Sequence, residues 1–89
     1  MTEVLVRADN LNINDVADGY VIYQGARDRV HYLNKTAAIV FELCDGDLGI
    51  DNIIRSVADL FKLEETHDEE IRNCIESLLK EGLVLSRST

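Results

Sequence analysis

The hydrophobic pattern of this chain changes its period once, near Asn34, and that change constrains the fold more than any other feature. Before Asn34 the chain shows a weak alternation of apolar and polar residues and short runs rich in aromatic and β-branched residues, as β-strands do. After Asn34 the apolar residues recur every three or four residues, as they do on one face of an amphipathic helix. Because 89 residues fit one domain, the sequence predicts a single α+β domain in which helices follow a sheet.

Three short strands are predicted before this change of period. Leu11–Ala17 alternates weakly, whereas Tyr20–Tyr23 and Arg29–Leu33 are rich in the aromatic and β-branched residues that strands favour. Asp18-Gly19 separates the first two strands and is a favoured two-residue hairpin turn, because both residue types tolerate positive φ. Gly25–Asp28 provides the second turn. The segment is therefore expected to form a three-stranded antiparallel meander.

Three helices are predicted after Asn34, whose side chain suits the N-cap of the first one. Thr36–Cys44 is apolar around most of its circumference, which indicates a buried core helix that stops at Gly46. The second helix runs from about Ile50 to Phe61 and carries its apolar residues on one face.

The third helix is predicted over Asp68–Glu81, after a polar loop at Lys62–Glu65. Thr66 and Glu69 form a capping box at its start, and Gly82 ends it. Its apolar stripe consists of Ile71, Cys74, Ile75, Leu78 and Leu79. Three helices with a small sheet are the content of a winged helix-turn-helix-like fold, here with the three-stranded antiparallel sheet first in the chain.

The predicted domain spans residues 11–85. Residues 1–10 form an N-terminal arm or a short strand, because Val4 and Val6 alternate with other residues but few further signals are present. Leu83–Leu85 is suited to one more short strand, and residues 86–89 are expected to form a polar tail.

No catalytic or metal-binding constellation is visible in the sequence. His31 and His67 lie on different predicted elements, and Cys44 and Cys74 lie in apolar helical surroundings, where a thiol packs as a small hydrophobic group. Metal sites need clustered ligands at fixed spacings, and the chain lacks a glycine-rich phosphate loop. We therefore predict a non-catalytic protein without a metal or cofactor. The cysteines are expected to be free thiols, with a bridge between helices as the alternative.

Charge and hydropathy argue against two further classes of partner. The formal net charge of −8 disfavours nucleic acid and anionic membranes, since both are bound through lysine and arginine. The third predicted helix, where a winged helix would contact DNA, carries five carboxylates against Arg72 and Lys80. No apolar run approaches the roughly 18 residues of a membrane span, and the N-terminus lacks the features of a secretory signal. A cytoplasmic protein is expected.

The edge of the predicted sheet offers a way to bind a partner. If Arg29–Leu33 is the edge strand and the third helix lies beside it, an extended peptide can add as a further strand in the groove between them. Val30, Tyr32, Ile75 and Leu79 are candidate apolar anchors, with core packing as the alternative role of each. Two other functions stay open: a winged-helix DNA-binding regulator, and a structural module that pairs with itself. The chain is expected to be a monomer or a homodimer.

The run Tyr32–Gly46 resembles the signature of PqqD-like proteins. These proteins show Leu-Asn, then a small polar residue, Ala, and a leucine-rich stretch that closes in Cys-Asp-Gly, here Cys44-Asp45-Gly46. Leu78–Val84 is similar to the Leu-x-x-x-Gly-Leu-Val at the end of their third helix. The resemblance covers roughly residues 11–85. It leaves the pathway open among those of pyrroloquinoline quinone, lasso peptides and other modified peptides. Gly49 departs from the usual Ser or Thr, and Gln24–Asp28 lacks the proline or leucine-rich pattern of the quinone-pathway members.

The resemblance implies a recognition element for ribosomally synthesised and post-translationally modified peptides. Such an element binds the leader of a precursor peptide as an added strand and presents the core segment to a tailoring enzyme, often a radical S-adenosylmethionine protein. Asn34 and the Cys44–Gly46 run are expected to be structural. Carried over by position, the peptide-binding residues would be Arg29, Val30, His31, Tyr32, Leu33, Arg72, Ile75, Glu76 and Leu79.

Overall fold

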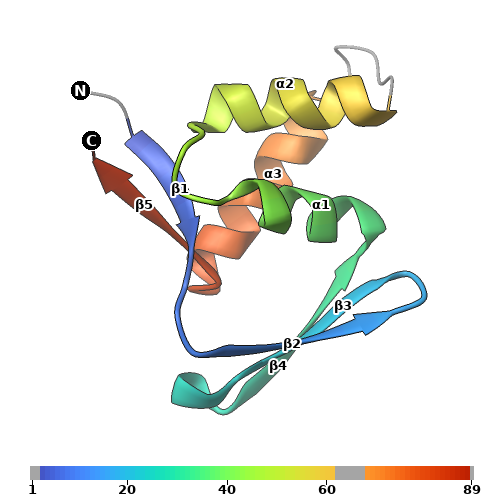
Figure 1. The fold of residues 1–89 in the computed structure, drawn as a ribbon, viewed down its shortest axis with the longest axis vertical. Helices are drawn as coiled ribbons and strands as arrows, with labels where there is room; N and C mark the ends of the chain where they lie inside the picture. The colour runs from blue at the N-terminus through green and yellow to red at the C-terminus, as the bar shows by residue number, and fades with distance from the viewer. Residues whose placement is uncertain (1–2, 62–67, 89) are drawn as a thin grey trace.

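The computed structural model describes residues 3–61 and 68–88 of the chain and confirms the predicted α+β architecture (Figure 1). A three-stranded antiparallel sheet is followed by three helices, and a two-stranded ribbon joins the ends of the chain. The strands are β1 (Glu3–Arg7), β2 (Leu11–Val16), β3 (Gly19–Gln24), β4 (Arg29–Asn34) and β5 (Val84–Ser88). The helices are α1 (Lys35–Leu43), α2 (Ile50–Phe61) and α3 (Asp68–Lys80), with a short 3-10 helix η1 (Gly25–Arg27) between β3 and β4.

The first hairpin turn lies one residue earlier than expected. Val16 pairs with Gly19, so the two turn residues are Ala17 and Asp18, neither of which has a positive φ. Gly19 instead begins β3 with a φ of 149°. A Cβ atom at this position would lie 1.8 Å from the carbonyl oxygen of Leu33 on β4. Glycine is therefore required by the close approach of β4 rather than by the turn itself.

The start of α1 and the end of α3 are where the sequence predicts them. Asn34 accepts a hydrogen bond on Oδ1 from the Ala37 amide at 2.8 Å, which confirms it as the N-cap of α1. Gly82 follows the last turn of α3 with a φ of 74°. The predicted loop at Lys62–Glu65 and the Thr66 cap lie outside the described residues.

The end of α1 differs from the prediction. The helix ends at Leu43, and Gly46 lies in the loop beyond it, with a φ of 95°. Arg7 of β1 supplies the cap instead, because its guanidinium donates to the Glu42 and Phe41 carbonyls at 2.6 and 3.4 Å. A cation at a helix C-terminus also interacts favourably with the helix dipole.

The N-terminal segment is a strand because it pairs with β5. The pairing is antiparallel, with Val6 opposite Leu85. The other edge of β1 is held by the α1–α2 loop, where the Leu5 amide donates to the Leu48 carbonyl and the Gly46 amide to the Leu5 carbonyl, both at 2.9 Å. Residues 86–88, expected to form a polar tail, belong to β5.

The core lies between the inner face of the β2–β3–β4 sheet and the helices, and it continues beneath the β1–β5 ribbon (Figure 1). Phe41 of α1 is its largest fully buried side chain, and the ring meets that of Tyr20 edge-on with centroids 6.4 Å apart. Burying one large apolar side chain contributes about 1.5–3 kcal/mol. The other fully buried large side chains include Leu5, Ile22, Ile53, Ile71, Ile75, Leu83, Val40, Val57 and Val84.

Candidate binding groove

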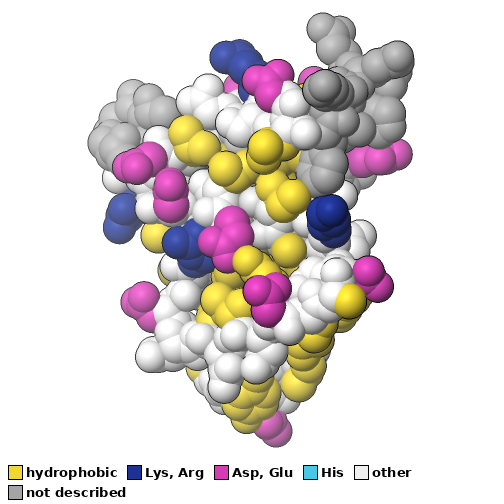
Figure 2. Space-filling view, turned by 45° about the vertical axis from the view of Figure 1, so that its right-hand side comes forward, with side chains coloured by type: hydrophobic (Ala, Val, Ile, Leu, Met, Phe, Trp, Pro, Cys, Tyr) yellow, Lys and Arg dark blue, Asp and Glu magenta, His cyan; other side chains and the backbone are white. Residues whose placement is uncertain are grey.

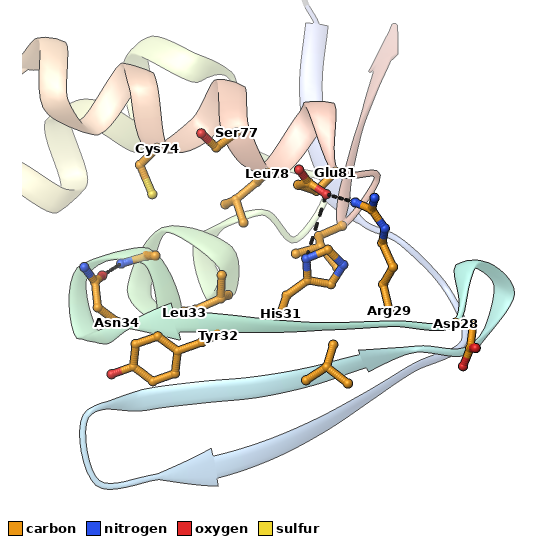
Figure 3. A pocket seen from close by; sticks show the side chains of 13 residues that line it. Asp28, Arg29, His31, Tyr32, Leu33, Asn34, Cys74, Ser77, Leu78 and Glu81 are labelled. Atoms are coloured by element: carbon orange, nitrogen blue, oxygen red, sulfur yellow. Dashed lines mark hydrogen bonds and ion pairs between the residues drawn. The ribbon is translucent and has the colours of Figure 1, made fainter.

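A groove lies between β4 and α3. In the strand order β2-β3-β4, β4 is an edge, so the backbone groups on its outer side have no partner within the sheet. α3 runs past this edge (Figure 3), and the groove between them has a volume of about 820 Å³. The residues that line it are Asp28, Arg29, Val30, His31, Tyr32, Leu33, Asn34, Ala37, Cys74, Ser77, Leu78, Glu81 and Leu83.

The side chains of β4 alternate between the two faces of the sheet. Arg29, His31 and Leu33 point toward α3 (Figure 3), and Leu33 is buried in the core. Val30 and Tyr32 point to the opposite face, where they are 66% and 60% exposed, and they border the mouth of the groove. A strand added to β4 would therefore direct every second side chain toward α3.

One end of the groove is polar. The Glu81 carboxylate lies 3.1 Å from the Arg29 guanidinium and 4.0 Å from Nδ1 of His31. Behind them the buried Gln24 places its Oε1 2.9 Å from Nε2 of His31. Because the Gln24 amide nitrogen donates to the main-chain carbonyl of Glu81, just after α3, its oxygen is the acceptor, and His31 is the donor in this contact.

The C-terminus of α3 is tied to the β3–β4 connection at this polar end. The Gln24 side chain donates to the carbonyls of Glu81 and Gly82 at 3.3 and 3.4 Å, and Arg27 donates to the Glu81 carbonyl at 3.1 Å. A Cβ atom at Gly82 would lie 3.0 Å from the Arg27 guanidinium. These contacts hold the end of α3 at a set distance from β4, and so they set the width of the groove there.

The opposite end of the groove is apolar. Leu33 and Leu78 are buried beneath it, and the half-buried Ala37 and Cys74 complete its floor. The exposed Ser77 forms the rim on α3 (Figure 3). An apolar side chain that entered here would be removed from water, which contributes about 25 cal/mol for each Å² of apolar surface.

Neither cysteine is activated as a nucleophile. Both are free thiols. Burial raises the pKa of Cys44 from 9.0 to about 12, and its Sγ lies 3.2 Å from the Val40 carbonyl, as a donor to it. Burial also raises the pKa of Cys74. Since the thiolate is the reactive form, both side chains stay protonated and unreactive near neutral pH.

The raised pKa of Cys44 predicts a loss of stability in alkaline solution. The thiol ionises near pH 9.0 in the unfolded chain but only near pH 12 in the folded one, so the folded state becomes less favoured as the pH rises through this window. We expect the free energy of unfolding, measured in urea at several pH values, to fall more steeply in the wild type than in Cys44→Ala. Hydrogen bonding to Glu42 raises the pKa of Tyr20 in both proteins, so the difference between their slopes isolates Cys44. Equal slopes would contradict the prediction.

α3 turns a different face to the groove than the sequence suggested. None of its four predicted residues lines the groove. Ile75 is fully buried in the core, and Arg72 pairs with Asp51 of α2 at 3.2 Å. Glu76 is exposed away from the groove, and Leu79 is half-buried against the core. The five predicted residues of β4, by contrast, all line the groove, and their role in binding a peptide stays a prediction.

The rotation of α3 has a simple physical cause. Its buried residues, Ile71, Ile75 and Leu78, pack into the core, and this leaves Cys74, Ser77 and Glu81 at intervals of three and four residues on the groove side. Hydrophobicity alone indicates Ile75 and Leu79 as groove residues. The groove side of α3 could have been identified from Cys74, Ser77 and Glu81, the row of smaller or polar residues beside the buried apolar stripe.

The described part of the chain shows neither a metal site nor a membrane-spanning helix. Among residues 3–61 and 68–88, no three histidine, cysteine, aspartate or glutamate side chains gather into a possible metal site. None of the helices described is both long and apolar enough to cross a membrane.

A known family matches most of the chain. The model of the family described as "Coenzyme PQQ synthesis protein D (PqqD)" matches residues 19–84. This stretch begins with β3 and ends at the first residue of β5, so it includes both walls of the groove. Searches of curated proteins and of solved structures found no significant match.

Proposed function

Because this chain belongs to the PqqD family, whose members are non-catalytic accessory proteins that work with a precursor peptide and a biosynthetic enzyme, we propose that it binds the leader of a ribosomally synthesised precursor peptide. The leader adds as a strand to β4 in the groove facing α3. The bound complex then presents the core segment to a modifying enzyme, such as a radical S-adenosylmethionine protein.

The observation that carries this proposal is the free edge of β4 beside a groove of about 820 Å³. An added strand satisfies the outer amides and carbonyls of β4, at about 0.5–1.5 kcal/mol net for each hydrogen bond. Micromolar affinity requires about 8 kcal/mol, so side-chain contacts must supply part of the binding energy. The apolar end of the groove, over Leu33, Ala37 and Leu78, is suited to this because it is already shaped and partly shielded.

DNA binding lacks a comparable observation. The exposed side of α3 carries Glu69, Glu70 and Glu76, and the first turn of the helix is acidic throughout. Phosphate contacts need cations at such a position, whereas Arg72 is engaged with Asp51.

Blocking the groove should weaken leader binding. We expect Ser77→Trp, which projects an indole from the α3 rim across the groove, to weaken the affinity for a synthetic leader peptide by about tenfold or more, equivalent to about 1.4 kcal/mol. The peptide is the leader of a short precursor chosen from the genomic neighbourhood of this chain, and binding is measured by calorimetry.

The matched control is Glu76→Trp, which adds the same indole to the neighbouring exposed position of α3, outside the groove. It should leave the affinity within about twofold of the wild type. A wild-type affinity in Ser77→Trp, or equal losses in both variants, would show that the leader does not occupy this groove.

A further inference from the structure

The β2–β3–β4 sheet has a second face that the helices leave uncovered. All three helices lie on one side of this sheet (Figure 1). The strand register places five apolar or aromatic side chains on the other side. We call this set the outer sheet face; it consists of Val16, Val21, Tyr23, Val30 and Tyr32. Four of its members are among the exposed large hydrophobic residues, at 41% for Val16, 42% for Tyr23, 66% for Val30 and 60% for Tyr32.

The two tyrosines of the outer sheet face are held in place at its two ends. The Tyr23 hydroxyl donates to Oδ1 of Asp28 at 3.2 Å, and the Tyr32 hydroxyl donates to the Asp18 carbonyl at 3.5 Å. Rings that are already fixed lose little conformational freedom when a partner covers them. Aromatic anchors of this kind dominate the binding energy of many protein interfaces.

The charges around the outer sheet face indicate which partner surface would be complementary to it. Among the residues of β2, β3 and β4, the polar side chains that share the face are Asn12, Asn14 and Asn34, which are uncharged. The turns at its two ends carry carboxylates, Asp18 and Asp28. The cation of the second turn, Arg27, is engaged with the Glu81 carbonyl at the end of the groove. A second copy would bring identical acidic ends together, and each copy has a net charge of −8. A protein surface with an apolar centre flanked by lysine or arginine is the complementary match.

The outer sheet face is continuous with the groove. Val30 and Tyr32 belong to the face and also border the groove mouth. A peptide strand added to β4 would widen the sheet and place its own alternate side chains beside Val30 and Tyr32. The apolar side chains along the lower part of the molecule, where the sheet lies, are seen in Figure 2.

We propose that the modifying enzyme docks on the outer sheet face, through an apolar patch flanked by basic side chains, and that the added leader strand forms part of the docking surface. This inference rests on the proposed function. Three strands of six residues form a face of roughly 20 by 14 Å, or about 280 Å². This area is smaller than the about 800 Å² that each partner buries in a typical stable interface. The leader strand enlarges this surface, so leader and enzyme bind cooperatively, and by reciprocity each tightens the binding of the other.

The test uses the full chain, the synthetic leader and a purified candidate modifying enzyme chosen from the genomic neighbourhood of this chain. Enzyme affinity is measured with and without leader, and leader affinity is measured separately without enzyme. The variants are Val30→Lys, Val30→Glu, and Tyr23→Ser, the last of which lies one strand away from the groove. Circular dichroism first confirms that each variant is folded.

We expect Val30→Lys to lower enzyme affinity by about tenfold or more. The loss in Val30→Glu should be several-fold smaller, because the basic side chains of the enzyme would repel a lysine but attract a glutamate. Tyr23→Ser should weaken enzyme binding while leader affinity stays within about twofold of the wild type. Leader should raise the wild-type affinity for the enzyme several-fold. Wild-type enzyme binding in Val30→Lys and Tyr23→Ser would overturn the inference, as would equal losses in the two Val30 variants.

Two further outcomes separate the hypotheses. If the wild type sedimented as a dimer and Val30→Lys as a monomer, the outer sheet face would bind a second copy of this chain. That result would overturn the inference. Failure of the wild type to bind leader would overturn the proposed function. The affinity for the enzyme, measured without leader, would still test docking on the outer sheet face.

Discussion

Gly19→Ala is expected to destabilise the domain by at least about 3 kcal/mol, the scale of a severe backbone conflict. The new Cβ would lie 1.8 Å from the Leu33 carbonyl oxygen, and the φ of 149° is one that alanine rarely adopts. Relief requires β3 to move away from β4 where Leu33 enters the core and Asn34 caps α1. Domains of this kind are stable by about 0.05–0.15 kcal/mol for each residue, so the loss is a large part of the total.

Urea unfolding followed by circular dichroism measures this effect. Gly25→Ala is the matched control, because the same methyl group added at Gly25 would lie 3.6 Å from the Tyr23 ring, an ordinary contact. We expect the control to stay within about 0.5 kcal/mol of the wild type. Equal unfolding midpoints for Gly19→Ala and the wild type would contradict the close approach of β3 and β4.

Phe41→Ala is expected to cost about 3–5 kcal/mol. Phe41 is 0% exposed at the centre of the core. Its removal leaves a cavity, takes away the edge-on contact with Tyr20, and removes the ring over which the Arg7 guanidinium lies, 5.9 Å from the ring centroid. Since Arg7 also caps α1, the contact of β1 with α1 should weaken together with the core.

The same urea experiment provides the measurement, and Leu60→Ala provides the control. Leu60 is apolar and helical like Phe41 but 62% exposed, so its truncation should change the free energy of unfolding by no more than about 0.5 kcal/mol. If the two variants lost similar stability, Phe41 would not occupy the core position described.

Much of the fold could be predicted because its signals are local. The aromatic and β-branched run Tyr20–Tyr23, the N-cap at Asn34 and the glycine at Gly82 each act within one turn or strand of the residue concerned. The acidic charge of α3, which disfavours DNA binding, is likewise readable from neighbouring residues. The groove strand, Arg29–Leu33, was predicted for this reason as well, since strand propensity and its position at the end of the meander are both readable along the chain.

Features that depend on distant contacts could not be read in this way. β1 was ambiguous because its partner β5 lies at the other end of the chain. Gly19 looked like a turn residue because its actual constraint, the Leu33 carbonyl, belongs to another strand.

The sequence by itself therefore determined the order of the main elements from β2 to α3, the acidic character of α3 and the strand that forms the groove, because each depends on neighbouring residues. The tertiary structure alone decided which side of α3 faces that strand. Ile75 and Leu79 are the more apolar residues, so burial in the core competes for them. The core packing then turns Cys74, Ser77 and Glu81 toward β4.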